Sequence, residues 1–434
     1  RKHARNQWIT TNYIPDYDRG IIGGSKELDF VSYTRYMVYG DNEGIGRRGY
    51  RVGNPLRISM ANDYFRPLGD TYGVMELQPG QVNWGAVNPQ PMPGAVRLWL
   101  WSVFAGGADF ICTYRYRQPL FGMEQYHYGI VGTDGVTLTH GGREYEQFMG
   151  EIRMLRKEAR PFDSKPDEYL KRTTAIMWNP ENYWSIDRQK QNRAWDTFRH
   201  LGHYYRSLKA YGAPVDFIGE DKDLGSYPVV IAPAYELVDS VLVGRWKEYV
   251  ENGGTLVLTC RTGNKDRNGR FPERPFGSMI EPLTGNKLEF YDLLLPAEPG
   301  IVAMDGAEYR WCTWGDVLSP GADSEVWATY KDEFYAGKPA VTFRRLGKGT
   351  VTYVGVDTED GLLERRVLDK LYARLGIGVM SLPYGITLEY RNGFGIVLNY
   401  SDSVYHFTVP RGSRILIGRE DLPTAGVLVF KLGQ

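Results

Sequence analysis

A carboxylate and an indole ring stand eight residues apart just after an apolar segment of the chain. Glu76 follows Tyr72 and Val74, and the turn signal Pro79-Gly80 comes before Trp84. A lone glutamate at the carboxyl end of a strand is where barrel enzymes place their chemistry. Beside a ring that stacks on a sugar, such a carboxylate can attack a glycosidic carbon. The alternative is that Glu76 only ends a strand, as most carboxylates in that position do.

A second polar pair follows the next apolar segment, residues 108–114, which predicts a buried strand. Glu124 and His127 are three residues apart, so in a helical turn they share a face. A charged acceptor and an imidazole together suit the binding of neighbouring sugar hydroxyls. Each alone is more often a surface or structural group, but the aromatic residues between them favour a site. No third ligand lies near in sequence, so we expect no metal here.

These segments resemble the β-galactosidases of glycoside hydrolase family 42. Four stretches in the family's order and spacing carry the resemblance: Glu76-Leu77-Gln78-Pro79-Gly80-Gln81-Val82-Asn83-Trp84, Pro93-Gly94-Ala95-Val96-Arg97-Leu98-Trp99, Tyr114-Arg115-Tyr116-Arg117-Gln118 and Glu124-Gln125-Tyr126-His127. Thr10-Thr11-Asn12 and Asp29-Phe30-Val31-Ser32 are also similar to the family. The family then has Trp-Asp-Asn-Tyr where this chain has Tyr33-Thr34-Arg35-Tyr36, so only Tyr36 carries over.

The resemblance implies retaining hydrolysis of terminal non-reducing β-D-galactosides, with a β-galactoside as the substrate. It makes Glu76 the nucleophile and assigns galactose binding to Trp84, Glu124 and His127, with Tyr36 and Tyr114 as pocket walls. A retaining glycosidase needs a second carboxyl group roughly 5 Å from the first. In the family this acid/base is a glutamate after an asparagine on the fourth barrel strand, which would precede residue 1.

One asparagine–glutamate pair in this chain, Asn42-Glu43, imitates that feature. It lies 33 residues before Glu76, in a glycine-rich stretch without a strand pattern before it. Two complete strand–helix units would have to fit between strands four and seven, which takes more residues at ordinary element lengths. We therefore interpret Glu43 as a loop carboxylate.

The fold implied is α/β, beginning in the middle of a TIM barrel. Residues 1–159 would form the second half of the catalytic (β/α)8 barrel, with residues 8–12, 30–33, 73–76 and 110–114 as strands five to eight. Half a barrel leaves two edge strands with unpaired backbone N–H and C=O groups. We therefore expect that this sequence is a fragment, or that its other half is a separate chain, and that the fragment alone is inactive.

Two further domains are expected after a proline-marked linker. Residues 160–378 alternate strands with helices, which indicates a mainly parallel, covered sheet; by resemblance it is an amidotransferase-like, flavodoxin-like trimerisation domain. Cys260 directly follows a strand there but lacks the flanking glycines of a nucleophile elbow, which favours a structural cysteine. Residues 379–434 show short strands and turns typical of a small antiparallel β domain.

Composition excludes several classes of partner. The chain has 52 basic and 52 acidic residues, so no basic footprint indicates nucleic acid. No apolar run is long enough to span a membrane, and the three cysteines make neither a disulfide framework nor a zinc set. We expect no cofactor, a homotrimer and a cytoplasmic location. The alternative function is a non-catalytic carbohydrate-binding or assembly subunit derived from such an enzyme.

Overall fold

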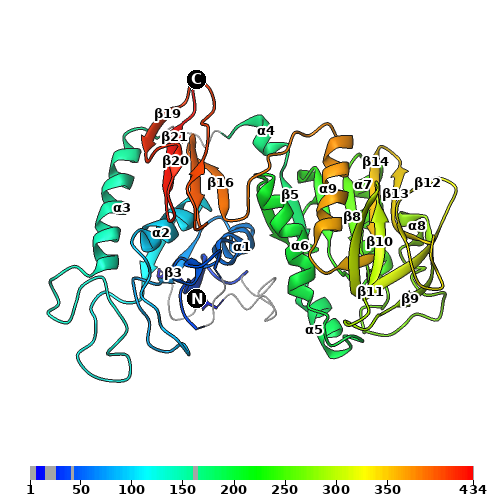
Figure 1. Ribbon diagram of the computed structural model, residues 1–434, viewed down its shortest axis with the longest axis horizontal. Coiled ribbons are helices and arrows are strands. Elements are labelled where there is room, and N and C mark those ends of the chain that lie inside the picture. Colours follow the sequence, from blue (N-terminus) through cyan, green and yellow to red (C-terminus); the bar gives the residue numbers. More distant parts are fainter. Residues whose placement is uncertain (1–5, 15–25, 41–43, 160–164, 434) are drawn as a thin grey trace. The chain divides into compact units, whose positions relative to one another are not determined.

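The computed structural model describes residues 6–14, 26–40, 44–159 and 165–433 (Figure 1). Contacts divide the chain into two compact units. One contains the described residues up to Leu170 together with those from Met380 onward; the other is Lys171–Val379. Asn42 and Glu43 lie outside the described residues. No helix among those described is long and apolar enough to cross a membrane.

Four parallel strands in chain order form the sheet of the first unit. They are β1 (Asn12–Tyr13), β2 (Val31–Arg35), β3 (Tyr72–Leu77) and β4 (Phe110–Thr113). The first strand is shorter and later than the predicted 8–12, because Ile9 instead bonds Asp29 through both its backbone groups. All parallel strands end at the same edge of a sheet, so the residues after each strand meet there.

The helices between these strands begin at identifiable caps. Asn54 accepts from the Leu56 N–H to start α1 (Pro55–Phe65), with proline as its first residue. Glu144 caps α2 (Ala95–Ala105) from another helix, since its two oxygens accept from the Gly94 and Arg97 N–H groups at 2.8 Å each. Thr139 caps α3 (His140–Arg156), since its side chain accepts from the Gly142 N–H at 3.1 Å.

The C-terminal strands pack on α2 within the same unit. Their four-stranded sheet has the order β16 (Ile386–Arg391), β17 (Phe394–Asn399), β21 (Val427–Lys431), β19 (Arg414–Ile417), beside the pair β18 (Tyr405–His406) and β20 (Asp421–Leu422). Ser102 of α2 shares a 2.6 Å hydrogen bond with the Tyr400 hydroxyl, and Arg391 donates to the Phe104 and Ala108 carbonyls. The β strands thus cover an apolar helix that would otherwise face water.

The second unit contains a mixed sheet whose parallel half has a recognisable order. It runs β6 (Val215–Ile218), β5 (Thr174–Met177), β7 (Val229–Ala232), β8 (Thr255–Thr259), β14 (Gly349–Val354). This is the 2-1-3-4-5 order of flavodoxin-like sheets. Antiparallel strands extend it: β9 (Asn286–Asp292), β10 (Gly300–Met304), β11 (Ala307–Pro320), β12 (Ser324–Tyr330), β13 (Pro339–Leu346) and β15 (Val356–Thr358).

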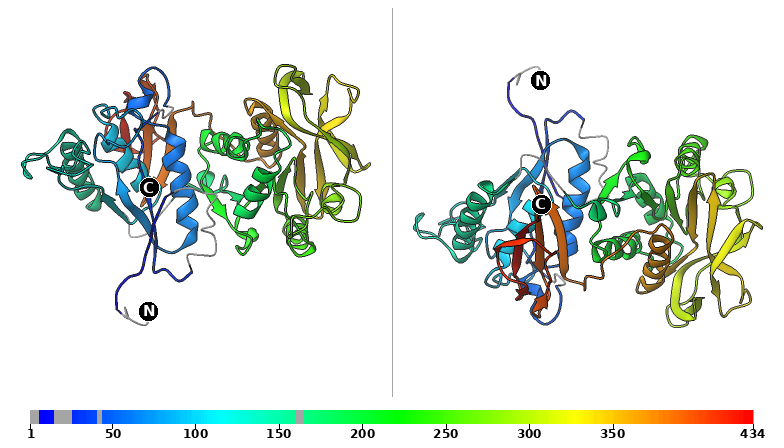
Figure 2. Two further views of the ribbon diagram at one scale, coloured as in Figure 1. Left: turned by 90° about the horizontal axis from the view of Figure 1, so that it is seen from below. Right: turned by 90° about the horizontal axis from the view of Figure 1, so that it is seen from above.

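Helices cover both faces of this sheet (Figure 2). The helices are α5 (Pro180–Arg188), α6 (Thr197–Ala210), α7 (Ser240–Glu251), the short α8 (Glu281–Thr284) and α9 (Leu362–Arg374). Leu258 of β8 belongs to the core that Trp246 of α7 fills, whereas the neighbouring Thr259 bonds His200 of α6. Side chains alternate along a strand, so α7 and α6 lie on opposite faces.

Candidate active site

Glu76 lies at the end of β3 and is held by donors from the two preceding strands. Its Oε1 accepts from Asn12 Nδ2 at 2.9 Å, and its Oε2 accepts from the Tyr36 hydroxyl at 2.8 Å. Asn12 is oriented in turn, because Thr34 donates to its Oδ1 at 2.6 Å. Burial and the hydrogen bond to Glu76 raise the pKa of Tyr36, so the phenol remains a neutral donor. The half-buried carboxylate is therefore fixed in orientation by two hydrogen bonds.

Trp84 contacts two tyrosine rings, one of which belongs to Tyr36, the donor to Glu76. Its indole meets the Tyr36 ring edge-on at 5.0 Å and the Tyr39 ring, tilted, at 4.8 Å. It is 47 % exposed, so part of the ring remains free to stack on a sugar. The contacts with Tyr36 and Tyr39 restrict the orientation of the indole ring.

His127 is buried and presents one unpartnered nitrogen. Its Nδ1 lies 3.0 Å from the Tyr128 carbonyl oxygen, an acceptor, which assigns the proton to Nδ1. Nε2 is then an acceptor, and it has no hydrogen-bond partner among the described residues. Burial lowers the pKa of His127, which keeps the ring neutral. The rings of Tyr36 and Tyr114 meet it edge-on at 6.1 and 5.4 Å.

Glu124 is held by the residues that follow β4. Its Oε2 accepts from the Tyr114 hydroxyl at 2.7 Å and from Arg115 at 2.6 Å. The hydrogen bond to Glu124, followed by burial, raises the pKa of Tyr114. Glu124 and His127 lie in a turn, where the His127 N–H donates to the Glu124 carbonyl at 2.9 Å, and not on the face of a helix. The two residues therefore share one hydrogen-bonded turn without a helix around it, and Tyr114 contacts both side chains.

The loops that carry these residues are tied together by backbone and amide hydrogen bonds. Asn83 donates to the Met123 carbonyl at 2.7 Å, and the Tyr128 N–H donates to the Gln81 carbonyl at 2.9 Å. Gln78 is fully buried and accepts from the Met37 and Val38 N–H groups. The loops after β2, β3 and β4 therefore support one another around Glu76.

All six residues singled out by the sequence lie in one continuous cluster: Tyr36, Glu76, Trp84, Tyr114, Glu124 and His127. Sequence reasoning did not name Asn12, Gln78 and Arg115 as site residues. Asn12 was visible only as part of the Thr10-Thr11-Asn12 stretch, and its bond to Glu76 spans 64 positions. Gln78 and Arg115 lie inside the stretches 76–84 and 114–118. Nothing in the sequence there distinguished a residue that supports the site from one without a role in it.

Cys260 in the second unit has the properties of a core residue. It is fully buried, and burial raises the pKa of its thiol. The left-handed residue of the turn after β8 is the next one, Arg261, with φ 68°. A nucleophile elbow places the nucleophile itself on that strained turn, and here Arg261 occupies it with its guanidinium over the Trp195 and Trp314 rings. This geometry favours the structural interpretation of Cys260.

Comparison with protein families gives two adjacent matches. A model described as "Beta-galactosidase" matches residues 1–155, and one described as "Beta-galactosidase trimerisation domain" matches residues 172–379. Among curated proteins, the β-galactosidase BgaH of Haloferax lucentense is 30 % identical over 96 % of this chain and 62 % of its own length. The β-galactosidase BgaB of Geobacillus sp. is 29 % identical over 93 % of this chain and 58 % of its own.

Solved structures show the same architecture. The β-galactosidase of the Antarctic haloarchaeon Halorubrum lacusprofundi has a TM-score of 0.87 and 27 % identity, covering 99 % of this chain and 64 % of its own. The β-galactosidase of the psychrophilic Marinomonas ef1 has a TM-score of 0.86 and 26 % identity, covering 100 % and 65 %. The chain thus spans less than two thirds of the length of each of these relatives.

Proposed function

This chain belongs to glycoside hydrolase family 42, and on that premise we propose that it supplies the nucleophile side of a retaining β-galactosidase site. The substrates are terminal non-reducing β-D-galactosides. One observation carries the proposal: Glu76 ends β3 with both oxygens oriented by Asn12 and Tyr36, beside the half-exposed ring of Trp84. A fixed carboxylate beside a sugar-stacking face suits nucleophilic attack on an anomeric carbon.

In the proposed mechanism Glu76 attacks the anomeric carbon and forms a covalent galactosyl–enzyme, while a carboxylic acid protonates the departing oxygen. Water then attacks the same carbon, the acid now acts as base, and Glu76 leaves as carboxylate. His127 Nε2 accepts from one sugar hydroxyl, since it is a buried acceptor without another partner. Glu124 binds further hydroxyls as a charged acceptor through its Oε1.

Glu124 is poorly placed to be the acid. Its Oε2 already accepts from a guanidinium and a phenol, an arrangement that suits a carboxylate and leaves this oxygen no proton to give. Among the described residues, Glu76 and Glu124 are the carboxylates whose charges act on both Tyr36 and His127. We therefore place the acid/base on a segment outside this sequence, whether on the same chain or another.

That segment would also complete the sheet. Among the described residues, β1 pairs only with β2 and β4 only with β3, so both outer edges lack a neighbour there. The parallel order and the site at the carboxyl ends of the strands fit strands five to eight of a (β/α)8 barrel. We infer that residues 1–159 are the second half of that barrel, and that this chain without the other half does not hydrolyse galactosides.

Trapping of the covalent intermediate tests the nucleophile. The complete protein is incubated with an activated 2-deoxy-2-fluorogalactoside, and the labelled peptide is identified by mass spectrometry. We expect one label, on Glu76. A Glu76→Ala variant should lose nearly all turnover, and azide should restore it with an α-galactosyl azide as product. Glu146→Gln, a change of an exposed carboxylate on α3, is the control. A label elsewhere, or near-normal hydrolysis by Glu76→Gln, removes Glu76 from the mechanism.

We further propose a homotrimer built through the α/β unit. Residues 172–379 match the trimerisation domain, and a heterologous contact repeated three times closes a ring. Sedimentation equilibrium on the complete protein should give three times the chain mass. A monomer mass that stays constant as concentration rises contradicts this assembly, and leaves the proposed catalytic role of Glu76 untouched.

A further inference from the structure

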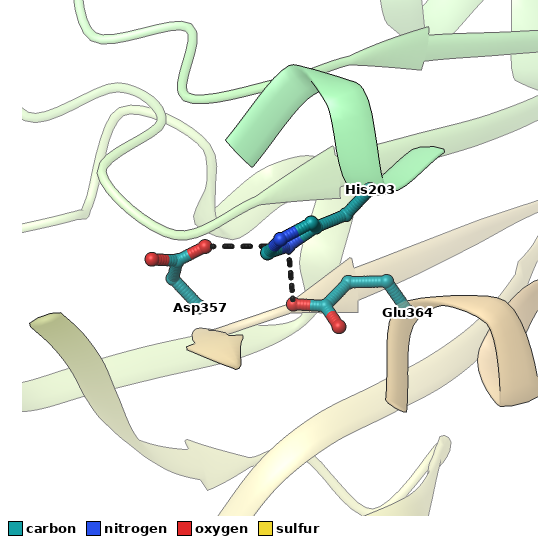
Figure 3. Close-up of side chains that lie close together, drawn as sticks. All are labelled: His203, Asp357 and Glu364. Atoms are coloured by element: carbon teal, nitrogen blue, oxygen red, sulfur yellow. Dashed lines mark ion pairs between the residues drawn. The ribbon is translucent and has the colours of Figure 1, made fainter. Parts of the chain in front are cut away.

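A buried imidazole faces two buried carboxylates in the second unit (Figure 3). His203 lies on α6, Asp357 on β15 and Glu364 in the first turn of α9. His203 Nδ1 is 3.7 Å from an oxygen of Asp357 and 3.8 Å from one of Glu364, and both carboxylate side chains are fully buried. The potential ligand atoms of the three residues all lie within 4.8 Å of one another.

His203 Nδ1 has no hydrogen-bond partner among the described residues although it is buried. Both carboxylate oxygens lie beyond hydrogen-bond reach, since such bonds are about 2.7–3.2 Å long. Gly361 packs against the ring, since a Cβ at Gly361 would come within 2.6 Å of His203 Cγ. A buried nitrogen in this position costs free energy unless a further group satisfies it.

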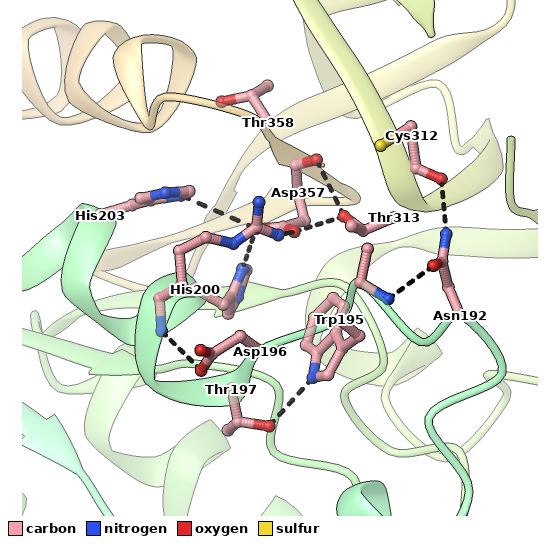
Figure 4. A network of polar contacts seen from close by, with 12 residues as sticks. Asn192, Trp195, Asp196, Thr197, His200, His203, Cys312, Thr313, Asp357 and Thr358 are labelled. Atoms are coloured by element: carbon pink, nitrogen blue, oxygen red, sulfur yellow. Dashed lines mark hydrogen bonds and ion pairs between the residues drawn. The ribbon is translucent and has the colours of Figure 1, made fainter. Parts of the chain in front are cut away.

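Asp357 is already oriented by donors on its other sides (Figure 4). Its Oδ1 accepts from His200 Nδ1 at 2.9 Å, and its Oδ2 accepts from Arg199 at 2.5 Å and from the Thr313 hydroxyl. His200 Nε2 lies 2.8 Å from the Thr259 hydroxyl, whose oxygen also accepts from the Ala234 N–H. The Thr259 hydroxyl lies within hydrogen-bond reach of Nε2 at 2.8 Å and of the Cys260 carbonyl at 3.4 Å, so His200 bridges Asp357 and Thr259.

Glu364 is fixed by a single neighbour. Its Oε1 accepts from the Thr358 N–H at 2.9 Å, and its Oε2 accepts from the Thr358 hydroxyl. Both donors are neutral, and His203 is the one basic side chain within ion-pair distance of this buried carboxylate among the described residues. Hydrogen-bonded carboxylates aimed at one imidazole resemble metal ligands held by an outer shell of donors.

From these contacts we propose that His203, Asp357 and Glu364 bind one divalent cation, most readily Zn²⁺. Zinc takes imidazole nitrogen and carboxylate oxygen at about 2.0–2.2 Å, which places tetrahedral donors about 3.4 Å apart. The observed 3.7 and 3.8 Å need only a small contraction. The cation satisfies the orphan nitrogen and places positive charge between two buried carboxylates that Arg199 alone does not balance.

The position in the fold agrees with a ligand site. Thr259 ends β8 and Asp357 follows β14, so the cluster lies where the strands of the α/β sheet end, the usual binding edge of such sheets. The cation joins α6 to the β15–α9 segment, which gives it a stabilising role. Sequence spacing predicts no metal here, because His203 and Asp357 are 154 residues apart.

Metal binding by the 434-residue chain tests the proposal without any variant. After removal of metal with a chelator, titration with ZnCl₂ should show one equivalent bound per chain. The melting temperature should rise by about 5 °C when zinc is near a hundredfold above its Kd. Co²⁺ should bind with the strong visible absorption of a four-coordinate site. If the wild-type chain binds neither ion stoichiometrically, the proposal is overturned.

Two variants then locate the bound ion. His203→Gln and Glu364→Gln remove a ligand and preserve most of the packing, and we expect each to lose the zinc-dependent rise in melting temperature. The matched control is His406→Gln, which changes an exposed histidine paired with Asp421 at 2.8 Å and should leave zinc binding unchanged. Unaltered zinc affinity and stoichiometry in a folded His203→Gln protein would also overturn the assignment.

Discussion

The side chain of Gln78 forms hydrogen bonds to both backbone groups of Val38, accepting from its N–H at 2.9 Å and donating to its carbonyl at 2.8 Å. It also accepts from the Met37 N–H and donates to the Gly80 carbonyl. One buried amide therefore links the loop after β2 to the end of β3. Tyr36 and Glu76, which bond each other, stand two residues before the linked positions.

Gln78→Leu should damage both stability and catalysis. The variant leaves four backbone groups unsatisfied, and we expect the free energy of unfolding to fall by about 3–5 kcal/mol. In the protein that still folds, kcat should fall because Tyr36 no longer holds Glu76. Denaturant unfolding and galactoside kinetics measure the two effects. Gln125→Leu, which removes one exposed amide bond to the Leu120 carbonyl, should change neither.

Tyr36→Phe should lower kcat/KM by about ten- to a hundredfold. The variant removes one donor to the charged Glu76 carboxylate, and hydrogen bonds to charged groups contribute about 1.5–3 kcal/mol. Tyr39→Phe is the matched control, because Tyr39 also touches Trp84 but its hydroxyl bonds Arg57. Steady-state kinetics of the complete protein decide the matter: equal effects of the two changes would contradict a specific role for Tyr36.

Galactoside binding should weaken in acid because of His127. Its neutral Nε2 accepts a sugar hydroxyl in the proposed site, and burial lowers its pKa, so this acceptor persists somewhat below pH 6.5. The unfolded chain takes up the proton first, so the free energy of unfolding also falls as pH drops below about 6.5. In His127→Asn both dependences should shrink. If KM of that variant still increases as strongly at low pH as in the wild-type protein, His127 is not the cause of the increase.

Asp316 should make the second unit less stable as pH rises. Burial raises its pKa to about 6, against hydrogen bonds from Tyr353 and Trp314 that lower it. The folded chain therefore binds the proton more tightly than the unfolded chain. The contribution of protonated Asp316 to the free energy of unfolding is present below pH 4 and is lost by about pH 6.

Asp316→Asn measures this effect. The variant should gain stability relative to the wild-type chain between pH 4 and pH 6, by up to about 3 kcal/mol at neutral pH. Thermal unfolding of both proteins across this range is the test. A difference between them that does not change with pH would show that the carboxyl group does not titrate in this range.

Short-range patterns were sufficient for many of the helices and strands. Residues 229–232 and 255–259 are apolar runs between turn signals and became β7 and β8, and the apolar pattern after Gly94 became α2. Residues 286–346, in contrast, contain five antiparallel strands that no sequence pattern predicted. Their side chains alternate irregularly in burial, as in β12, and such strands depend on neighbours far along the chain.

The sequence by itself determined which residues are candidates for the chemistry, because Glu76 and Trp84 belong to one strand end and the turn after it. Only the tertiary structure decided what holds them, since the Glu76 bonds to Asn12 and Tyr36 span 64 and 40 positions. The His203, Asp357 and Glu364 cluster arises in the same way. Periodicity encodes contacts within one element, whereas the parallel packing of distant strands brings such partners within hydrogen-bond distance.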